Sequence, residues 1–308
     1  MTLVVFGAGA VGSLLAARLT ATGRPVRLVG RPEHVAAIRS DGLRVEGVGA
    51  GTFRCEAVSD LGTPSDVEVV LLTVKTFNLA DAAAAIGRSI GPVPVLLTQN
   101  GLGIEPRVVA ALRGAGWEDA DHEVVRAVHS LPATWVGPGV VRAAGSGEVA
   151  LPDLEHHPAL SVPIRRFLDL FRGAGIPVRT VADLEREIWK KALVNAAVNP
   201  VTAVHRVRNG ELRSGPLRVD AEHLLQEAIT VAHAAGVPIP VEEATGELDR
   251  IVRATAENRS SMLQDVERGR PTEVDAISGE LVRRGAAGGI DLPFTREYIA
   301  RLRSAAAP

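Results

Sequence analysis

A lysine and two asparagines recur at four-residue spacing in the second half of the chain, at Lys191, Asn195 and Asn199. At 3.6 residues per turn these positions share one face of a helix and drift by only about 40° per step. A lone helical lysine is ordinarily solvated, but asparagine is a poor helix former, and two in line with the lysine favour a site. The neighbouring Lys190 points about 100° away and is expected to be a surface lysine. Such a face could protonate an oxygen that gains negative charge and could hydrogen-bond a polar ligand.

A glycine pattern near the start of the chain could hold phosphate. In a chain with 31 glycines the pattern G-x-G-x-x-G is weak by itself, and a plain glycine turn stays the alternative. Its context strengthens it, because residues 2–6 resemble a buried strand, residues 13–22 a helix, and residues 25–29 a second strand. We therefore expect a pyrophosphate cradle at a helix N-terminus. The cradle residues are Gly7, Ala8, Gly9, Ala10, Val11 and Gly12.

The residues after the second strand bear on the choice of dinucleotide. A carboxylate there would bind a ribose 2′-hydroxyl, but the sequence places Arg31 at this point and has no carboxylate until Glu33. An arginine after a strand can be an ordinary surface charge. Its position relative to the glycine pattern nevertheless favours NADP over NAD.

The elements that must position these residues change character along the chain. Strand-like residues 67–74 and 93–98 alternate with the helical run 79–90, which predicts a parallel sheet. Short strand-like pieces over 124–150 predict hairpins that extend or flank the sheet, and a helix at 159–174 and a strand at 177–181 follow. Beyond these, five helical stretches dominate: 183–204, 216–235, 241–268, 272–287 and 293–304.

This pattern predicts an α/β protein with an N-terminal Rossmann doubly wound sheet and a C-terminal, mostly α-helical domain. We place the two domains at residues 1–182 and 183–308, as a dinucleotide-binding and a substrate-binding, catalytic part. Two domains suit a chain of 308 residues.

Composition excludes several functional classes. The net charge of −2 gives no sign of nucleic-acid binding, and no apolar run is long enough to span a membrane. The first positive charge, Arg18, follows the apolar start, so a secretory leader is disfavoured and the cytoplasm is the expected location. The single cysteine, Cys55, excludes an intrachain disulfide, and no histidine spacing indicates a metal site.

Further stretches, taken in order along both halves of the chain, resemble the ketopantoate reductase family. They are LTVKT at 72–76, TQNGLG at 98–103, WKKALVNAAVNP at 189–200, NRSSMLQD at 258–265 and PTEVD at 271–275. The resemblance implies NADPH-dependent reduction of a 2-keto acid, most of all 2-dehydropantoate to pantoate in coenzyme A synthesis. It leaves open a relative that reduces another 2-keto acid or oxidises a 2-hydroxy acid, and a non-catalytic NADP-binding sensor. A homodimer also stays open.

The resemblance implies a general-acid role for Lys191, with Asn195 and Asn199 binding the substrate. The matching glutamate, Glu273, would orient the ammonium and lie by the cofactor. A structural explanation of Glu273 competes, because Thr272 and Asp275 resemble a capping box that would put it in the first turn of a helix.

Four more residues gain roles from the resemblance. Ser261 is expected to contact the substrate carboxylate and Asn258 to contact the substrate as well, as neighbours three apart on a predicted helix. Lys75 and Asn100 follow predicted parallel strands at their carboxyl ends, where α/β sheets bind ligands. Both are assigned to the cofactor, and Asn100 also to the substrate. Ordinary turn chemistry is the alternative for Asn100, which precedes a glycine.

Overall fold

The computed structural model describes residues 1–305, which fall into two compact units. Unit 1 comprises Met1–Gln99 and Ile104–Leu184, and unit 2 comprises Asn100–Gly103 and the chain from Glu185 onward. The four-residue loop Asn100–Gly103 therefore groups with unit 2, although it connects two elements of unit 1.

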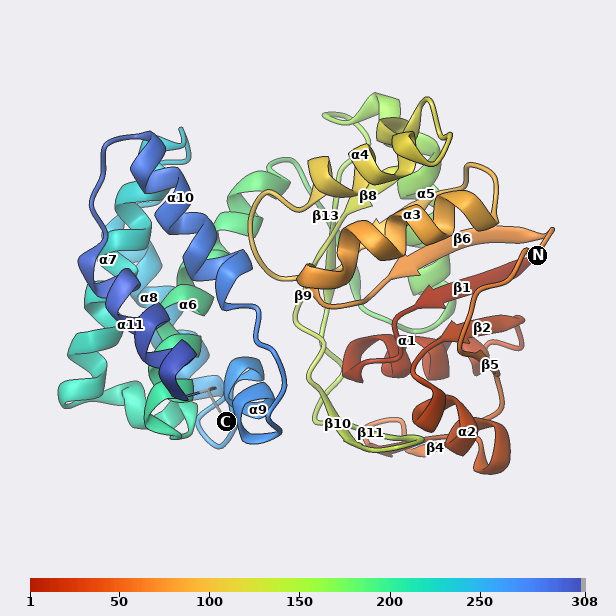
Figure 1. The fold of residues 1–308 in the computed structure, drawn as a ribbon, viewed down its shortest axis with the longest axis horizontal. Coiled ribbons are helices and arrows are strands. Elements are labelled where there is room, and N and C mark those ends of the chain that lie inside the picture. Colours follow the sequence, from red (N-terminus) through yellow and green to blue (C-terminus); the bar gives the residue numbers. More distant parts are fainter. Residues whose placement is uncertain (306–308) are drawn as a thin grey trace. The chain divides into compact units, whose positions relative to one another are not determined.

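A six-stranded parallel sheet with the order β5-β2-β1-β6-β7-β8 forms the centre of unit 1 (Figure 1). The strand order reverses next to β1, which pairs with both β2 and β6, and such a reversal opens a ligand crevice at the carboxyl ends of the strands. The bounds are β1 Thr2–Phe6, β2 Val26–Val29, β5 Glu56–Val58, β6 Val67–Leu72, β7 Val95–Leu97 and β8 Val124–Arg126.

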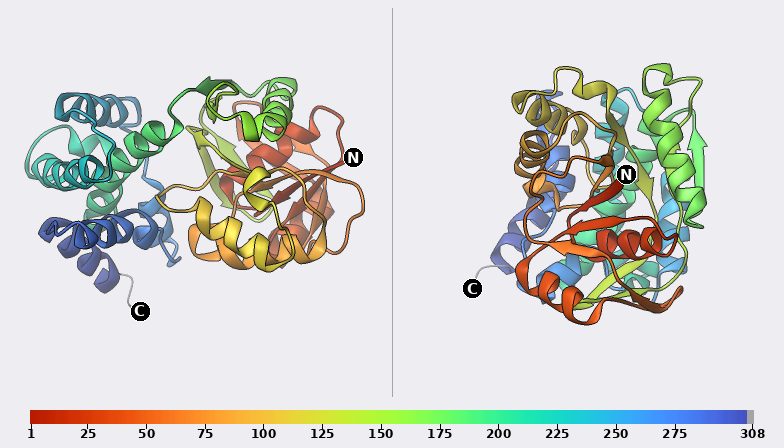
Figure 2. Two further views of the ribbon diagram at one scale, coloured as in Figure 1. Left: turned by 90° about the horizontal axis from the view of Figure 1, so that it is seen from above. Right: turned by 90° about the vertical axis from the view of Figure 1, so that its right-hand side faces the viewer.

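Helices cover both faces of this sheet, which explains why its strands are continuously apolar. Alternate strand residues such as Val5 and Leu71 pack with α1 and α5, and their neighbours Val4 and Val70 pack with α3 and α4. Figure 2 shows α3 and α4, in orange and yellow, on one side of the sheet and α5, in green, on the other. These helices are α1 Ala10–Thr20, α3 Leu79–Ser89, α4 Glu105–Gly114 and α5 Ser161–Gly173.

Two smaller sheets complete unit 1. The antiparallel hairpin β10–β11 pairs with β3 in a sheet of order β10-β11-β3-β4, and β12 lies between β9 and β13 in the other. The predicted hairpin region thus flanks the main sheet, except that β8 extends it. The remaining elements are α2 Pro32–Asp41, β3 Leu43–Gly47, β4 Gly51–Phe53, β9 Val128–His129, β10 Ala133–Gly137, β11 Val140–Ala143, β12 Val149–Pro152, β13 Val178–Val181, and the 3₁₀ turns η1 Thr76–Asn78, η2 Ala120–His122 and η3 Pro158–Leu160.

Unit 2 is built around the helix α6. Residues 192–194 and 196–203 of this helix are all buried, and the alanine, leucine and valine residues among them belong to one hydrophobic core with residues of α7, α8 and α11. A helix that is apolar around most of its circumference must be enclosed by others. The elements are α6 Leu184–His205, η4 Asn209–Arg213, α7 Pro216–Ala234, α8 Val241–Ala254, α9 Ser261–Glu267, a π-helical segment η5 Asp275–Gly279, α10 Glu280–Ala287 and α11 Pro293–Ala305. The predicted α/β class, with a Rossmann sheet and a helical C-terminal part, is confirmed.

The predicted single helix 241–268 is wrong, because the chain leaves the helix after Ala254 and starts α9 at Ser261. Ser260 caps α9: its Oγ accepts the Leu263 N–H at 3.1 Å and the Thr202 hydroxyl at 2.7 Å. A buried serine that satisfies a helix N-terminus and a neighbouring helix at once stabilises this break.

Candidate active site

The loop between β1 and α1 packs against the backbone that follows β6. Gly7 has φ +124°, and a Cβ there would lie 2.6 Å from the Val74 nitrogen. A Cβ on Gly12 would lie 2.0 Å from the Gly7 oxygen and 2.4 Å from Thr73 Oγ1. The Thr73 hydroxyl also donates to the Gly7 oxygen at 2.7 Å. Both glycines are therefore required by close packing of helix, loop and strand end.

Gly9 differs from the other two glycines because a Cβ there would meet no atom within 4 Å. It is exposed and is the N-cap of α1, where it offers no side chain to the first-turn N–H groups, and that turn has no acidic residue. An open helix N-terminus with uncapped donors is suited to bind an anion such as a pyrophosphate. The predicted cradle therefore has the local structure that phosphate binding needs.

Arg31 lies at the N-cap of α2, directly after β2. Pro32 at the first helical position disfavours helical backbone in the preceding residue, and Arg31 is extended with φ −69° and ψ 148°. Its side chain is exposed and makes no hydrogen bond or ion pair with residues 1–305. Gly30 lets this strand end approach the cradle, since a Cβ there would lie 2.4 Å from the Ala8 Cβ.

Lys75 and Asn100 both follow strands of the parallel sheet. Lys75 is half-buried and is the N-cap of the short η1 turn after β6. Asn100 begins the loop that belongs to unit 2, where the Leu102 N–H donates to the Ala276 oxygen at 3.3 Å. Gly101, with φ +102°, allows this approach because a Cβ would lie 2.5 Å from the same oxygen. The Asn100 Oδ1 is buried and has no hydrogen-bond partner in the described part of the chain.

The row Lys191, Asn195 and Asn199 lies on α6, as predicted from its spacing. Lys191 and Asn195 are half-buried, and Asn199 is only 5% exposed. Within residues 1–305 the side-chain amides of Asn195 and Asn199 make no hydrogen bond. Lys190 instead pairs with Glu243, with an Nζ to Oε1 distance of 3.3 Å. The row is thus a polar, ligand-ready strip on the central helix of unit 2.

Glu273 is buried, with 8% exposure, and precedes the π-helical segment rather than lying in a first helical turn. Its backbone oxygen accepts the N–H groups of Ala276 and Ile277 at 3.1 and 3.2 Å. The capping-box prediction is wrong: the Thr272 hydroxyl accepts the Val274 N–H at 3.4 Å, and the Asp275 carboxylate pairs with Arg303 at 2.8 Å. The backbone oxygen of Glu273 therefore accepts the first N–H groups of this helical segment, and Thr272 and Asp275 do not form a capping box.

Asn258 and Ser261 do not share a helix face, contrary to prediction. Asn258 lies in the turn between α8 and α9, where its backbone oxygen accepts the backbone N–H of Asn209 at 3.0 Å. Ser261 is the first residue of α9, and both side chains are exposed. The helical periodicity of residues 241–268 concealed the Ser260 cap that separates them.

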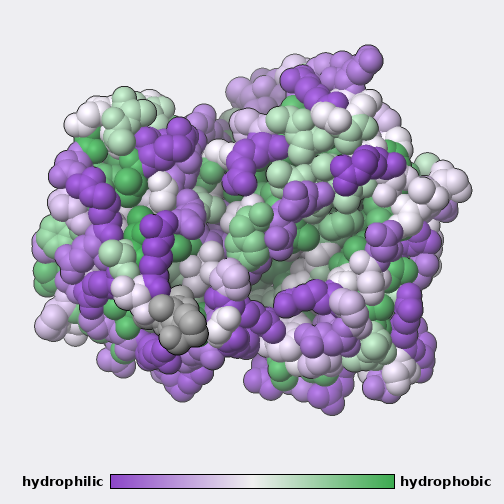
Figure 3. Space-filling view, viewed as in Figure 1, coloured by the Kyte–Doolittle hydropathy of each residue, from purple (hydrophilic) through white to green (hydrophobic). Residues whose placement is uncertain are grey.

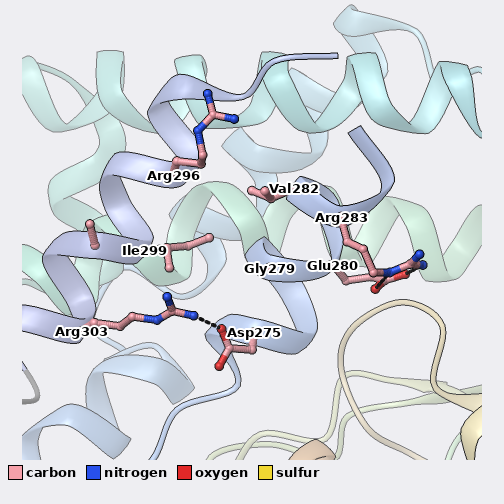
Figure 4. A pocket seen from close by; sticks show the side chains of 9 residues that line it. Asp275, Gly279, Glu280, Val282, Arg283, Arg296, Ile299 and Arg303 are labelled. Atoms are coloured by element: carbon pink, nitrogen blue, oxygen red, sulfur yellow. Dashed lines mark hydrogen bonds and ion pairs between the residues drawn. The ribbon is translucent and has the colours of Figure 1, made fainter. Parts of the chain in front are cut away.

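A cavity of about 490 Å³ lies within unit 2. It is bordered by the π-helical segment, α10 and α11, and Figure 4 shows Arg303 reaching Asp275 across it. Its other arginines are also paired, Arg283 with Glu280 and Arg296 with Asp291. None of the side chains predicted to act in the site lines this cavity.

The surface carries hydrophilic side chains between hydrophobic ones on the face drawn in Figure 3. Among the described residues, none of the helices combines the length and apolar character that crossing a lipid bilayer requires.

Two residues that position the cradle were missed from sequence, namely Thr73 and Gly30. The sequence signal for both is their position: each directly follows a buried strand of the sheet, where only a small or hydrogen-bonding side chain fits. Their partners, Gly7 and Ala8, are remote in sequence, so the signal has meaning only once the strand order is known.

The strand order, the reversal beside β1 and the open glycine cradle define a dinucleotide-binding protein of the Rossmann class. Residues 3–156 match the family described as ketopantoate reductase PanE/ApbA, and residues 183–306 match its C-terminal domain. The chain belongs to the ketopantoate reductase family of oxidoreductases, as the sequence motifs predicted.

Individual relatives agree with this assignment. The chain is 33% identical over 300 residues to the 2-dehydropantoate 2-reductase of Archaeoglobus fulgidus, covering 97% of this chain and 96% of the relative. A solved PanE/ApbA family ketopantoate reductase from Ralstonia eutropha JMP134 is similar with a TM-score of 0.87 and 31% identity, over 99% of this chain and 98% of that one. D-mandelate dehydrogenase, solved with NADH and anilino(oxo)acetate, shares the fold with a TM-score of 0.90 at 23% identity, over 99% of this chain and 98% of that one.

The glycines of the cradle should differ in what they contribute to stability. We expect Gly12→Ala to lower the free energy of unfolding by about 1–3 kcal/mol, because the new Cβ overlaps backbone that cannot yield. Gly9→Ala is the matched control and should cost less than about 1 kcal/mol, because its Cβ enters open space and only the capping preference is lost. Urea unfolding of both variants measures this, and equal losses would contradict the packing role of Gly12.

Proposed function

We propose that this protein reduces 2-dehydropantoate to pantoate with NADPH as the hydride donor. The observation that carries the proposal is the presence, in one member of the ketopantoate reductase family, of an uncapped glycine cradle and of the row Lys191, Asn195 and Asn199. The cradle supplies a phosphate site and the row supplies a proton donor with two amides. A reductase of a polar keto acid needs both.

The cofactor residues fit a phosphorylated dinucleotide. The N–H groups that begin α1 carry no side-chain cap, and Gly9 leaves their approach open, as a pyrophosphate requires. The Arg31 guanidinium, which has no hydrogen-bond or ion-pair partner among residues 1–305, is suited to a 2′-phosphate, which binds arginine in a bidentate manner. Lys75 and Asn100, at the carboxyl ends of β6 and β7, complete this set. When bound, the reduced nicotinamide supplies a hydride to the keto carbon.

The chain itself handles the proton and the substrate. As the keto carbon gains hydride, its oxygen becomes negative, and Lys191 donates a proton to it from Nζ. The amides of Asn195 and Asn199, which make no hydrogen bond within residues 1–305, lie on the same helix face as Lys191 and are available to the polar groups of the keto acid. Ser261 and Asn258, exposed around the start of α9, are assigned to the substrate carboxylate and to a second polar contact.

We assign Glu273 to the orientation of the Lys191 ammonium and to the cofactor. Its burial supports this assignment, because a carboxylate that is only 8% exposed needs polar or cationic partners. The functional division at residues 1–182 and 183–308 and a cytoplasmic location belong to the same proposal.

The activity is tested by following NADPH oxidation with a panel of 2-keto acids that includes 2-dehydropantoate, and NADP reduction with the matching 2-hydroxy acids. We expect the highest kcat/KM for 2-dehydropantoate, because a pocket discriminates by its contacts with the side chain of the acid. A higher kcat/KM for another acid would mean that this acid, rather than 2-dehydropantoate, is the substrate. Cofactor binding without turnover on every acid would instead favour a non-catalytic sensor.

The proton donor is tested by Lys191→Ala. We expect kcat for 2-dehydropantoate to fall by about 10²–10⁴-fold, the usual contribution of a general acid, with the Kd of NADPH nearly unchanged. Lys190→Ala is the matched control, because this adjacent lysine is held by Glu243. Equal activity of the two variants would refute the role of Lys191.

The 2′-phosphate contact is tested by Arg31→Ala. We expect the preference for NADPH over NADH to fall by about tenfold or more, because a charged hydrogen bond is lost only with the phosphorylated cofactor. The dissociation constants of both cofactors measure the preference. If their ratio stays at the wild-type value, Arg31 does not read the phosphate.

A further inference from the structure

A histidine buried in unit 1 connects the two ends of the proposed cofactor site. His34, in the first turn of α2, is 3% exposed. Its Nδ1 accepts the Gly139 N–H at 2.9 Å, and its Nε2 lies 3.0 Å from Ser13 Oγ. Because a backbone N–H can only donate, Nδ1 carries no hydrogen, and the ring hydrogen resides on Nε2 and is donated to Ser13. Both ring nitrogens are therefore used.

The two partners of this ring come from different elements. Ser13 directly follows Gly12 in the first turn of α1, and its N–H bonds the oxygen of Gly9 at 2.9 Å. Gly139 lies in the turn between β10 and β11. His34 thereby fixes the start of α2 relative to the cradle helix on one side and to the hairpin on the other.

The start of α2 is also where Arg31 lies. Arg31 is the N-cap of this helix, and its oxygen accepts the Val35 N–H at 3.0 Å. Among residues 1–305 its side chain has no hydrogen-bond or ion-pair partner, so the backbone at the start of α2 is what places the Arg31 Cα from which the side chain extends. Binding by a long side chain costs rotamer entropy, and a backbone that is already fixed adds no further ordering cost.

The charges around His34 suit a neutral ring that acts through its two hydrogen bonds. Burial lowers the pKa of His34, the nearby Arg31 lowers it further, and Glu33 opposes them. The first turn of α1 has no acidic residue. On the side of the hairpin, the uncharged ring of Trp135 lies near His34, with 6.3 Å between the two ring centroids. The ring therefore stays neutral at pH 7 and keeps both hydrogen bonds.

We infer that His34 is a positioning residue for cofactor selectivity: by tying the start of α2 to Ser13 and Gly139, it holds Arg31 where the 2′-phosphate of NADPH is recognised. The inference rests on the proposed role of Arg31. His34 itself is buried and acts through Arg31 and through the N-terminus of α2, whose dipole also favours a phosphate.

Two near-isosteric substitutions separate the two hydrogen bonds. In His34→Asn the side-chain oxygen replaces Nδ1, so the bond from Gly139 is kept and the bond to Ser13 is lost. In His34→Gln the amide nitrogen replaces Nε2, so the bond to Ser13 is kept and the bond from Gly139 is lost. Ser13→Ala removes the hydroxyl alone and is the variant to use where a substitution at His34 prevents folding.

The measurement is the dissociation constant of NADPH and of NADH for each variant of the full chain, together with its Tm. We expect His34→Asn and Ser13→Ala to reduce the preference for NADPH by roughly three- to tenfold, because a displaced Arg31 loses part of a charged hydrogen bond. The affinity for NADH should change by less than about twofold on the same reasoning. His233→Gln is the control, since it alters a hydrogen-bonding histidine of α7 and should leave the ratio unchanged.

A lower Tm with equal weakening of both cofactors would overturn the inference, because a merely structural histidine affects both alike. An unchanged preference in His34→Asn and in Ser13→Ala would overturn it as well. Arg31→Ala separates this failure from that of the proposed function. If Arg31→Ala abolishes the preference while the other variants retain it, only the role of His34 is wrong. If Arg31→Ala also retains it, the 2′-phosphate assignment fails too.

Discussion

The contact between the β1–α1 loop and the backbone after β6 is the constraint on which the nucleotide site depends. Strand order places β1 beside β6, and the two strand ends approach so closely that a Cβ on Gly7 or Gly12 would overlap backbone atoms. Thr73 closes the contact with a hydrogen bond to the Gly7 oxygen. This packing directs the N-terminus of α1 toward the carboxyl edge of the sheet and leaves Gly9 as the open face, so the donors of the helix remain available for phosphate.

Unit 2 is subject to a different constraint, because the helix α6 supplies both part of its hydrophobic core and a row of polar side chains. Most of the second half of α6 is buried, including small residues such as Ala196 and Ala197 that allow neighbouring helices to approach. Polar side chains on such a helix cost free energy unless they find partners. Thr202 finds them in the Val198 oxygen and in Ser260, whereas the side-chain amides of Asn195 and Asn199 make no hydrogen bond among residues 1–305. These amides are the physical basis for assigning the row of Lys191, Asn195 and Asn199 to a ligand.

The elements around this helix gain their geometry from contacts far along the chain. Ser260 begins α9 inside the single helix predicted at 241–268, and its Oγ bonds Thr202 of α6. Asp275 does not form the expected capping box with Thr272, because its carboxylate pairs with Arg303 of α11. Asn100 begins a loop whose Leu102 N–H binds Ala276, in the π-helical segment after Glu273. In each case a hydrogen bond or ion pair with a residue remote in sequence decides the local conformation, and the local sequence pattern contains no sign of that partner.

The sequence by itself determined the class, the βαβ start and the helix with its row of polar residues, because these depend on hydrophobic periodicity and on spacing along one element. The family followed from the resemblance of motifs that occur in order along both halves of the chain. It did not yield α2, the short strands β3 to β5, or the break at Ser260. Only the tertiary structure decided that Gly30 and Thr73 support the cradle, that Asn258 and Ser261 lie off a common helix face, and that His34 joins α2 to α1. The reason is that these features arise from atoms of remote residues meeting at hydrogen-bond or van der Waals distance, and such meetings follow from strand order and helix packing rather than from neighbouring residues.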